Sequence, residues 1–225
     1  MRVPTRPQSY FRCPLNRILA SEGAVRVLRE LALRGGELSI PPLALATKLN
    51  KQTVRDTLLG DLAATGVIEP VGQGRSVSYR LRTAHPLHGA ITHLFEAEEA
   101  HAQRVFQALE EAAQAIAPVL AIWIYGSVAR GEDTPGSDFD VALVLPETNT
   151  EPAVAVYRER LRPVLDREQV YASVVGLSPA DILRLLEEDA PWWRNVVAEA
   201  HPVQGLPPAR LADHLRRTQG GKRVA

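Results

Sequence analysis

The sequence predicts an α+β fold in which a helix-rich N-terminal part and a strand-containing C-terminal part are joined by a long helix. Three observations support this fold class. Apolar residues recur at helical spacing through residues 21–64. Residues 85–117 then form one long helical stretch with glutamates along one face. Beyond residue 118, apolar runs at 121–125 and 138–145 are typical of buried strands.

The N-terminal part is predicted to contain three helices and a hairpin. Ser21 caps the first helix and Gly35-Gly36 ends it, with a short extended piece at 38–40 before the second. The third runs from about 52 to 64 and ends at Gly66, and strands follow at 67–71 and 76–82. The side chains expected to face the core of the second and third helices are Leu43, Leu45, Ala46, Leu49, Val54, Leu58, Leu59 and Leu62.

This order of helices followed by a glycine-tipped hairpin resembles the winged helix-turn-helix repressors, notably the ArsR- and MarR-like groups. The resemblance implies a DNA-binding domain over residues 15–84, whose third helix enters the major groove of double-stranded DNA. It also implies a set of DNA-contacting residues: Lys51, Gln52, Thr53, Arg55 and, at the tip of the hairpin, Arg75. The alternative is a winged helix used for protein contacts or dimerisation.

The charge distribution favours a polyanion as partner of the N-terminal part only. Residues 1–90 carry 13 Lys and Arg against 6 Asp and Glu, whereas residues 91–225 carry 13 against 20. The whole chain of 225 residues is therefore neutral although its two parts are not. Ordinary solvated surface would give the same totals, so the charge supports the DNA-binding hypothesis without deciding it.

Residues 85–117 are predicted to be a connecting helix, which packs the two domains or pairs with a second copy in a homodimer. The C-terminal domain is predicted over residues 118–205, with a helix at 151–166, a strand at 170–177 and a helix capped by Ser178. Trp192 and Trp193 lie in a further helix, and residues 206–225 form a basic tail that we expect to be short and frayed.

Two acidic residues separated by one position mark the most informative site. Asp138 and Asp140 flank Phe139 at the mouth of a strand, where an extended backbone points both carboxylates to the same face. Such a pair suits Mg²⁺, which typically takes one or two carboxylates together with water and substrate phosphates. Gly126, at the end of the preceding strand, lets the backbone approach a ligand closely, and Ser127 offers an amide and a hydroxyl.

The whole segment from Trp123 to Leu145 resembles the minimal nucleotidyltransferases of the polymerase-beta superfamily: a Gly-Ser turn, an Ala-Arg-Gly segment, a Ser-Asp-x-Asp motif and an apolar strand. The resemblance implies transfer of a nucleoside monophosphate from a nucleoside triphosphate, with Mg²⁺ or Mn²⁺ as cofactor. Asp138 and Asp140 are the implied catalytic metal ligands. The implied nucleotide-binding residues are Gly126 and Ser127, on the β and γ phosphates, and Arg130, on the leaving pyrophosphate.

One position departs from the pattern of that superfamily. A third carboxylate is expected on the following strand, but Ser173 stands there and the nearest acid, Glu168, lies about five residues away. The leading hypothesis is therefore a nucleotidyltransferase that uses ATP and a hydroxyl acceptor, which the resemblance to antitoxin members places on a partner protein. The alternative is a DNA-binding regulator whose transferase domain senses nucleotide with little or no turnover. Modification of a small molecule such as an aminoglycoside is a weaker third reading.

Composition limits the remaining classes. The single cysteine, Cys13, excludes an internal disulfide framework and fits a reducing compartment. No apolar run reaches the length of a membrane span, and the N-terminus lacks a signal-peptide pattern, so we expect a cytoplasmic protein without membrane contact. The six histidines show no paired ligand spacing that would indicate a zinc site.

Overall fold

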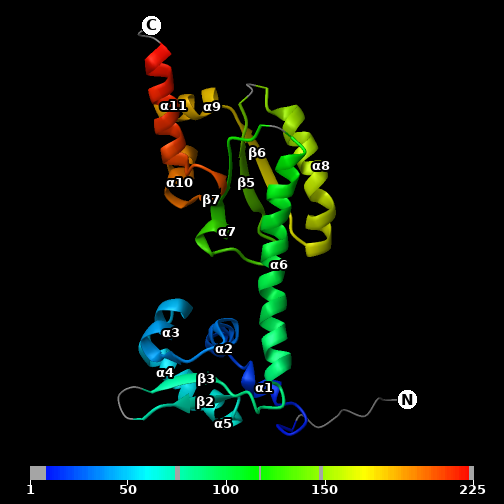
Figure 1. Cartoon of the computed structure of the whole chain (residues 1–225), viewed down its shortest axis with the longest axis vertical. Coiled ribbons are helices and arrows are strands. Elements are labelled where there is room, and N and C mark those ends of the chain that lie inside the picture. Colours follow the sequence, from blue (N-terminus) through cyan, green and yellow to red (C-terminus); the bar gives the residue numbers. More distant parts are fainter. Residues whose placement is uncertain (1–8, 74–76, 117, 147–148, 223–225) are drawn as a thin grey trace, which may run out of the picture. The chain divides into compact units, whose positions relative to one another are not determined.

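The computed structural model describes residues 9–73, 77–116, 118–146 and 149–222. The chain divides into two compact units, Met1–Ala100 and His101–Ala225, and each is described by itself (Figure 1). The division falls inside the long helix α6, His88–Gln114, which lies within the predicted connecting helix of residues 85–117. The prediction of a mixed α+β chain with a small mixed sheet in its C-terminal part is confirmed.

The first unit contains helices and a three-stranded antiparallel sheet in the order β1-β3-β2. Ser21 accepts a hydrogen bond from the Ala24 amide and caps α2, as predicted, and Gly35 ends that helix with a left-handed φ of 61°. In chain order the elements are α1 Leu15–Ile18, α2 Glu22–Arg34, β1 Leu38–Ser39, α3 Ile40–Thr47, α4 Lys51–Thr57, η1 Leu58–Leu62, α5 Ala63–Thr65, β2 Ile68–Val71 and β3 Ser78–Leu81.

The predicted third helix is interrupted. Helix α4 ends at Thr57, a π-helical turn η1 follows, and Gly60 inside it has non-helical backbone angles, φ −82° and ψ −123°. Glycine has a lower helix propensity than most residues, and it tolerates such backbone angles because it has no Cβ. The expectation of one continuous helix from 52 to 64 is therefore wrong at this glycine.

Two leucines that were expected in the core of the first unit are exposed. Leu45 is 84% exposed and Leu59 is 60% exposed, whereas Leu43, Val54, Leu58 and Leu62 are buried as predicted. In α3 the buried side chains are Leu43 and Thr47, four residues apart, and Leu45 lies on the opposite face of the same helix. A run of alternating leucines looks apolar in sequence, but only one helical face can meet the core.

The second unit is built on a four-stranded mixed sheet in the order β6-β5-β4-β7. Strand β4 pairs antiparallel with both β5 and β7, and β5 pairs parallel with β6. The elements are the end of α6, β4 Ala121–Tyr125, α7 Gly126–Arg130, β5 Phe139–Val144, α8 Glu151–Glu168, β6 Ala172–Leu177, α9 Pro179–Glu187, α10 Pro191–Glu199, β7 His201–Gly205 and α11 Pro208–Lys222.

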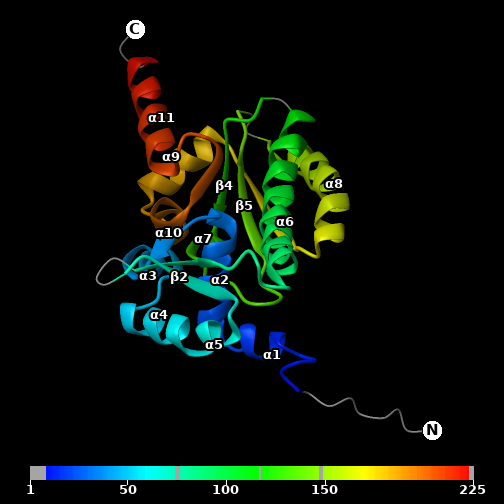
Figure 2. The same cartoon turned by 60° about the horizontal axis from the view of Figure 1, so that its bottom comes forward.

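Helices cover both faces of this sheet, as Figure 1 and Figure 2 show. The end of α6 and helix α8 pack on one face, where Phe139, Val141 and Leu143 of β5 are buried with them. Helices α9, α10 and α11 pack on the other face against Ala142 and Val144. Because successive strand residues point to opposite faces, Asp140 lies on the side of α9, α10 and α11.

The segment after residue 205 is not a frayed tail. It forms α11, and Leu211 and Ala212 of that helix are buried against Trp123 and Val196. Strand β7, which extends the sheet beside β4, was also not predicted, since its residues His201 to Gly205 show no alternation of apolar and polar side chains. Its pairing depends on the backbone of β4 rather than on its own pattern.

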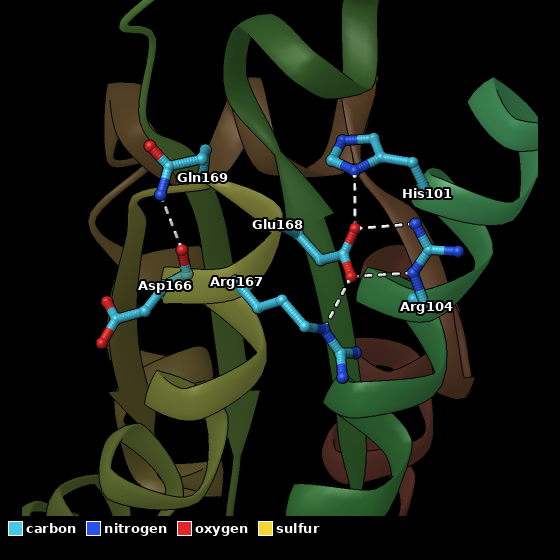
Figure 3. A network of polar contacts seen from close by, with 6 residues as sticks. All are labelled: His101, Arg104, Asp166, Arg167, Glu168 and Gln169. Carbon is cyan, nitrogen blue, oxygen red and sulfur yellow. Dashed lines mark hydrogen bonds and ion pairs between the residues drawn. The ribbon is translucent and has the colours of Figure 1, made fainter.

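An ion-pair network joins α6 to the end of α8 (Figure 3). The Glu168 carboxylate accepts hydrogen bonds from Arg104 Nε at 2.7 Å and Nη2 at 2.9 Å and lies 2.9 Å from His101 Nδ1. Arg167 Nε donates from the neighbouring position at 3.0 Å. Arg104, followed by His101, lowers the pKa of Glu168 from its usual 4.5 to about 2. Glu168 is therefore ionised, and its polar contacts link α6 to α8.

A Glu168→Gln substitution is expected to reduce stability in a pH-dependent way. Because the pKa of Glu168 is depressed on folding, its contribution is complete above about pH 4.5 and disappears as the pH falls through about 2. Thermal unfolding midpoints of the wild type and the variant should therefore differ at pH 7 and converge in acid. Asp166→Asn is the matched control, since the Asp166 side chain is exposed and forms a weak ion pair with Arg162 across 3.7 Å. A difference that stays constant from pH 7 to pH 2.5 would contradict the assignment.

Candidate active site

The site begins where strand β4 ends and α7 begins. Tyr125 is the last residue of β4, and Gly126 has a φ of 76°, a left-handed conformation that side chains other than glycine rarely adopt. A Cβ at position 126 would overlap the Asp140 Oδ2 atom. The backbone conformation therefore favours glycine at position 126, and any larger residue would also require the Asp140 carboxylate to turn away.

The two aspartates lie at the start of β5. Asp138 precedes the strand and is exposed, and Asp140 is half-buried opposite Tyr125 in the strand register. Within the residues that the structure describes, neither carboxylate has a hydrogen bond or an ion pair at 4 Å or less. Both are thus available to a ligand rather than consumed by arginine.

The electrostatic environment of Asp140 is negative. Burial raises its pKa, the charges of Asp138 and Glu199 raise it further, and Arg130 opposes them. A divalent cation would relieve this repulsion, because its positive charge offsets the negative charges around Asp140. Two unpartnered carboxylates, Asp138 and Asp140, beside the start of α7 fit Mg²⁺ or Mn²⁺ chemically.

Arg130 lies at the end of α7 and is engaged by two glutamates. Its Nε donates to Glu132 Oε2 at 2.8 Å and its Nη1 donates to Glu199 Oε2 at 2.6 Å. Hydrogen bonds to Glu132 and then to Glu199 raise the pKa of the guanidinium. Glu199 Oε1 also accepts the Gly126 amide hydrogen at 3.0 Å. One carboxylate therefore binds the glycine and the arginine that the sequence predicts to bind phosphate.

Glu199 was missed by the sequence analysis. It lies at the end of α10, far along the chain from Gly126, and no local motif surrounds it. Its proximity arises because α10 packs on the same face of the sheet as Asp140. The nearest signal in the sequence is the pair Trp192-Trp193, which starts the same helix.

The two tryptophans have different roles. Trp193 is buried, and its ring centre is 6.0 Å from that of Trp123 within the core. Trp192 is half-exposed and packs edge-on against Tyr125, with ring centres 5.4 Å apart. Since Tyr125 is the register partner of Asp140, Trp192 and not Trp193 borders the site.

Strand register places Ser173 of β6 directly opposite Asp140 of β5. Side chains of register partners share one face of a sheet, so a carboxylate at 173 would stand beside Asp140. Glu168 does not substitute for it, because Arg104, His101 and Arg167 hold that side chain at the end of α8. Across the described ranges, no group of three or more His, Cys, Asp or Glu side chains is arranged to hold a metal ion.

A separate cavity of about 370 Å³ lies in the second unit, and neither aspartate lines it. Phe106 and Phe139 are in its wall with ring centres 6.3 Å apart, together with Tyr171, His101 and Gln169. Phe139 belongs to the buried cluster on the face of α6 and α8, so this cavity is distinct from the carboxylate pair on the other face.

Four of the five residues predicted to contact DNA, Lys51, Gln52, Thr53 and Arg55, lie in α4 of the first unit. Lys51 and Arg55 are exposed, and no ion pair to either is present among the described side chains. Gln52 donates to Asp56 at 2.8 Å, and the Thr53 amide donates to the capping Asn50 side chain at 2.8 Å. Arg75 falls outside the described residues. In the hairpin, Glu69 of β2 forms an ion pair with Arg80 of β3 at 2.8 Å, so the charge of Arg80 is offset within the hairpin.

Comparison with known proteins supports the chemistry of the second unit. Residues 105–191 match the protein family described as "Nucleotidyltransferase domain". The chain therefore contains a nucleotidyltransferase domain, and the match includes Gly126, Ser127, both aspartates and Ser173. It ends before Glu199.

Some solved structures are similar to this chain at low sequence identity. One is a toxin-antitoxin with AMP-PNP, with 16% identity and a TM-score of 0.37. The match covers 53% of this chain and 90% of that one. A mutant of the toxin-antitoxin MntA-HpeT matches at 14% identity and a TM-score of 0.35, with the same coverage of 53% and 90%. No curated protein matches the chain. Among the helices that the structure describes, none has the length and apolar composition needed to cross a bilayer.

The close approach at Gly126 can be tested by comparing two glycines of α7. Gly126→Ala should lower the free energy of unfolding by about 1.5–3 kcal/mol, because the Asp140 carboxylate must turn away in addition to the strain of a left-handed residue. Gly131→Ala is the control: its φ is 66°, but a Cβ there meets nothing within 4 Å, so about 1–2 kcal/mol is expected. Urea unfolding measures both. Equal losses would show that Asp140 does not restrict position 126.

Proposed function

We propose that the chain is a Mg²⁺- or Mn²⁺-dependent nucleotidyltransferase that moves a nucleoside monophosphate from ATP to a hydroxyl acceptor. The observation that carries this proposal is the pair of unpartnered carboxylates, Asp138 and Asp140, against the glycine at the start of α7, within the matched family region. In this proposal Asp138 and Asp140 hold the cation. Gly126, Ser127 and Arg130 hold the terminal phosphates.

The proposed reaction is an in-line displacement at the α-phosphorus. The acceptor oxygen forms a bond to that phosphorus, the bond to the bridging oxygen of the β-phosphate breaks, and pyrophosphate leaves while the hydroxyl proton passes to water. A bound divalent cation supplies charge neutralisation on the phosphates and on the developing oxyanions. The arginine at position 130 offsets charge on the leaving pyrophosphate. The resemblance to antitoxin nucleotidyltransferases supports an acceptor hydroxyl on a partner protein.

The two aspartates are expected to be required for transfer. Asp138→Asn and Asp140→Asn should each lower incorporation of label from α-labelled ATP into acceptor in a host lysate by about 100-fold or more, because each removes one anionic ligand of the cation. Asp166→Asn is the control and should retain wild-type transfer, since Asp166 is exposed on α8. Unchanged labelling in both site variants would refute the catalytic assignment.

A second candidate function is a nucleotide-sensing regulator with little turnover. Ser173 beside Asp140 favours it, because a serine hydroxyl neither binds a second cation tightly nor acts as a general base. The same experiment separates the two functions. If the wild-type chain binds ATP with Mg²⁺ but transfers no label to an acceptor, the chain is a sensor.

We also propose that residues 15–84 form a winged helix that binds double-stranded DNA, followed by a connecting helix over 85–117, the transferase domain over 118–205 and a C-terminal segment over 206–225. Helices α2, α3 and α4 with the β2–β3 hairpin have the order of elements that such a domain needs. Exposed Lys51 and Arg55 on α4 support this helix as the DNA-contacting element.

Removing two of the proposed phosphate contacts should weaken DNA binding and flatten its salt dependence. The double variant Arg55→Ala, Arg75→Ala is expected to reduce the slope of log K against log salt by about 2, since each phosphate contact contributes about 0.9. Fluorescence anisotropy with duplex DNA across a salt series measures this slope. Arg34→Ala serves as control because Glu30 already pairs with Arg34 at 2.8 Å. If the wild type binds no duplex even in dilute salt, the first unit is a protein-binding module.

A further inference from the structure

Glu199 occupies the two groups that the proposed function assigns to phosphate. Its Oε1 accepts the Gly126 amide hydrogen at 3.0 Å and its Oε2 accepts from Arg130 Nη1 at 2.6 Å. The side chain is only 15% exposed, so these bonds are partly shielded from water. A carboxylate and a phosphate present the same kind of anionic acceptor to such donors.

The Gly126 amide and Arg130 cannot bind both Glu199 and a phosphate fully at the same time. A backbone amide has one hydrogen, so a phosphate oxygen can use the Gly126 amide only when Glu199 leaves it. Arg130 retains further N–H groups, but Glu132 occupies Nε and Glu199 occupies Nη1. A triphosphate that arrived with Glu199 in place would also bring its negative charge close to the Glu199 carboxylate.

The backbone around Glu199 is held independently of its side chain. Val196 and Trp193 of α10 are buried in the core, and His201 Nε2 lies 3.0 Å from the Ala129 carbonyl oxygen of α7. Release of the carboxylate therefore needs rotation of one side chain and no displacement of α10.

We propose that Glu199 is a resident anion that occupies the phosphate-binding groups of Gly126 and Arg130 and is displaced when the triphosphate binds. This inference rests on the proposed nucleotidyltransferase function. It makes Glu199 a positioning residue that keeps Gly126 and Arg130 paired in the absence of nucleotide. It also sets the affinity for nucleotide below the value that the same donors would give if they were vacant.

Isothermal titration of the full-length chain with a nonhydrolysable ATP analogue and saturating Mg²⁺ tests the proposal. Glu199→Gln should bind the analogue about tenfold more tightly than the wild type, the effect expected from losing one charge-assisted competitor. Binding of AMP should change by less than about twofold, because AMP lacks the β and γ phosphates. Glu132→Gln is the matched control: it removes the other ion pair of Arg130, at 2.8 Å, without touching Gly126.

The outcomes separate the two proposals. Equal or weaker binding of the ATP analogue by Glu199→Gln, with binding by the wild type intact, overturns the role of Glu199 and leaves the proposed function standing. An equal gain in Glu132→Gln also overturns it, since general charge removal would then explain both. If neither the wild type nor either variant binds the analogue, the proposed function fails and this inference fails with it.

A crystal structure of the wild type with the analogue gives an independent test that needs no variant. The Gly126 amide should donate to a phosphate oxygen, with Glu199 turned away. A bound analogue with Glu199 still on that amide would overturn the proposal.

Discussion

The close approach of Gly126 to Asp140 is the constraint on which the site depends. It exists because β4 and β5 pair antiparallel with Tyr125 opposite Asp140, which places the end of one strand beside the start of the other. The absent Cβ and the positive φ at position 126 let α7 begin directly against the carboxylate. The strand pairing and this glycine together bring the Asp140 carboxylate beside the start of α7.

The second feature of the site is its unbalanced charge. Asp138, Asp140 and Glu199 together exceed the single guanidinium of Arg130, which Glu132 also engages. This excess of negative charge is the feature of the site that supports the proposed binding of a cation. Elsewhere in the same unit, the acid Glu168 forms ion pairs with Arg104 and Arg167 and a hydrogen bond with His101, and it links α6 to α8. Acids of the same type thus serve opposite purposes according to the number of cations around them.

The elements with strong local signals were predicted well. The caps at Ser21 and Ser178 and the strand over 121–125 follow from short-range chemistry, and the structure contains all three. The predictions were wrong where tertiary packing determines which side chains are buried and where a helix forms. Leu45 and Leu59 are apolar but face away from the core, Gly60 breaks a helix that its neighbours would continue, and α11 forms because Leu211 and Ala212 find a buried surface. A helix can be read from spacing, but the face that it buries depends on its partners.

The sequence by itself was enough to single out Gly126, Ser127, Asp138 and Asp140 as candidate site residues, because they are close in the chain and joined by short elements. The sequence also showed that Ser173 stands where an acid is expected, because this depends only on the residue type and its position along the strand. Only the tertiary structure decided that Glu199 reaches Gly126 and Arg130, and that Glu168 does not reach the site. The physical reason is that a contact between residues far apart in the chain depends on how whole helices pack on the sheet, and no local pattern records that packing.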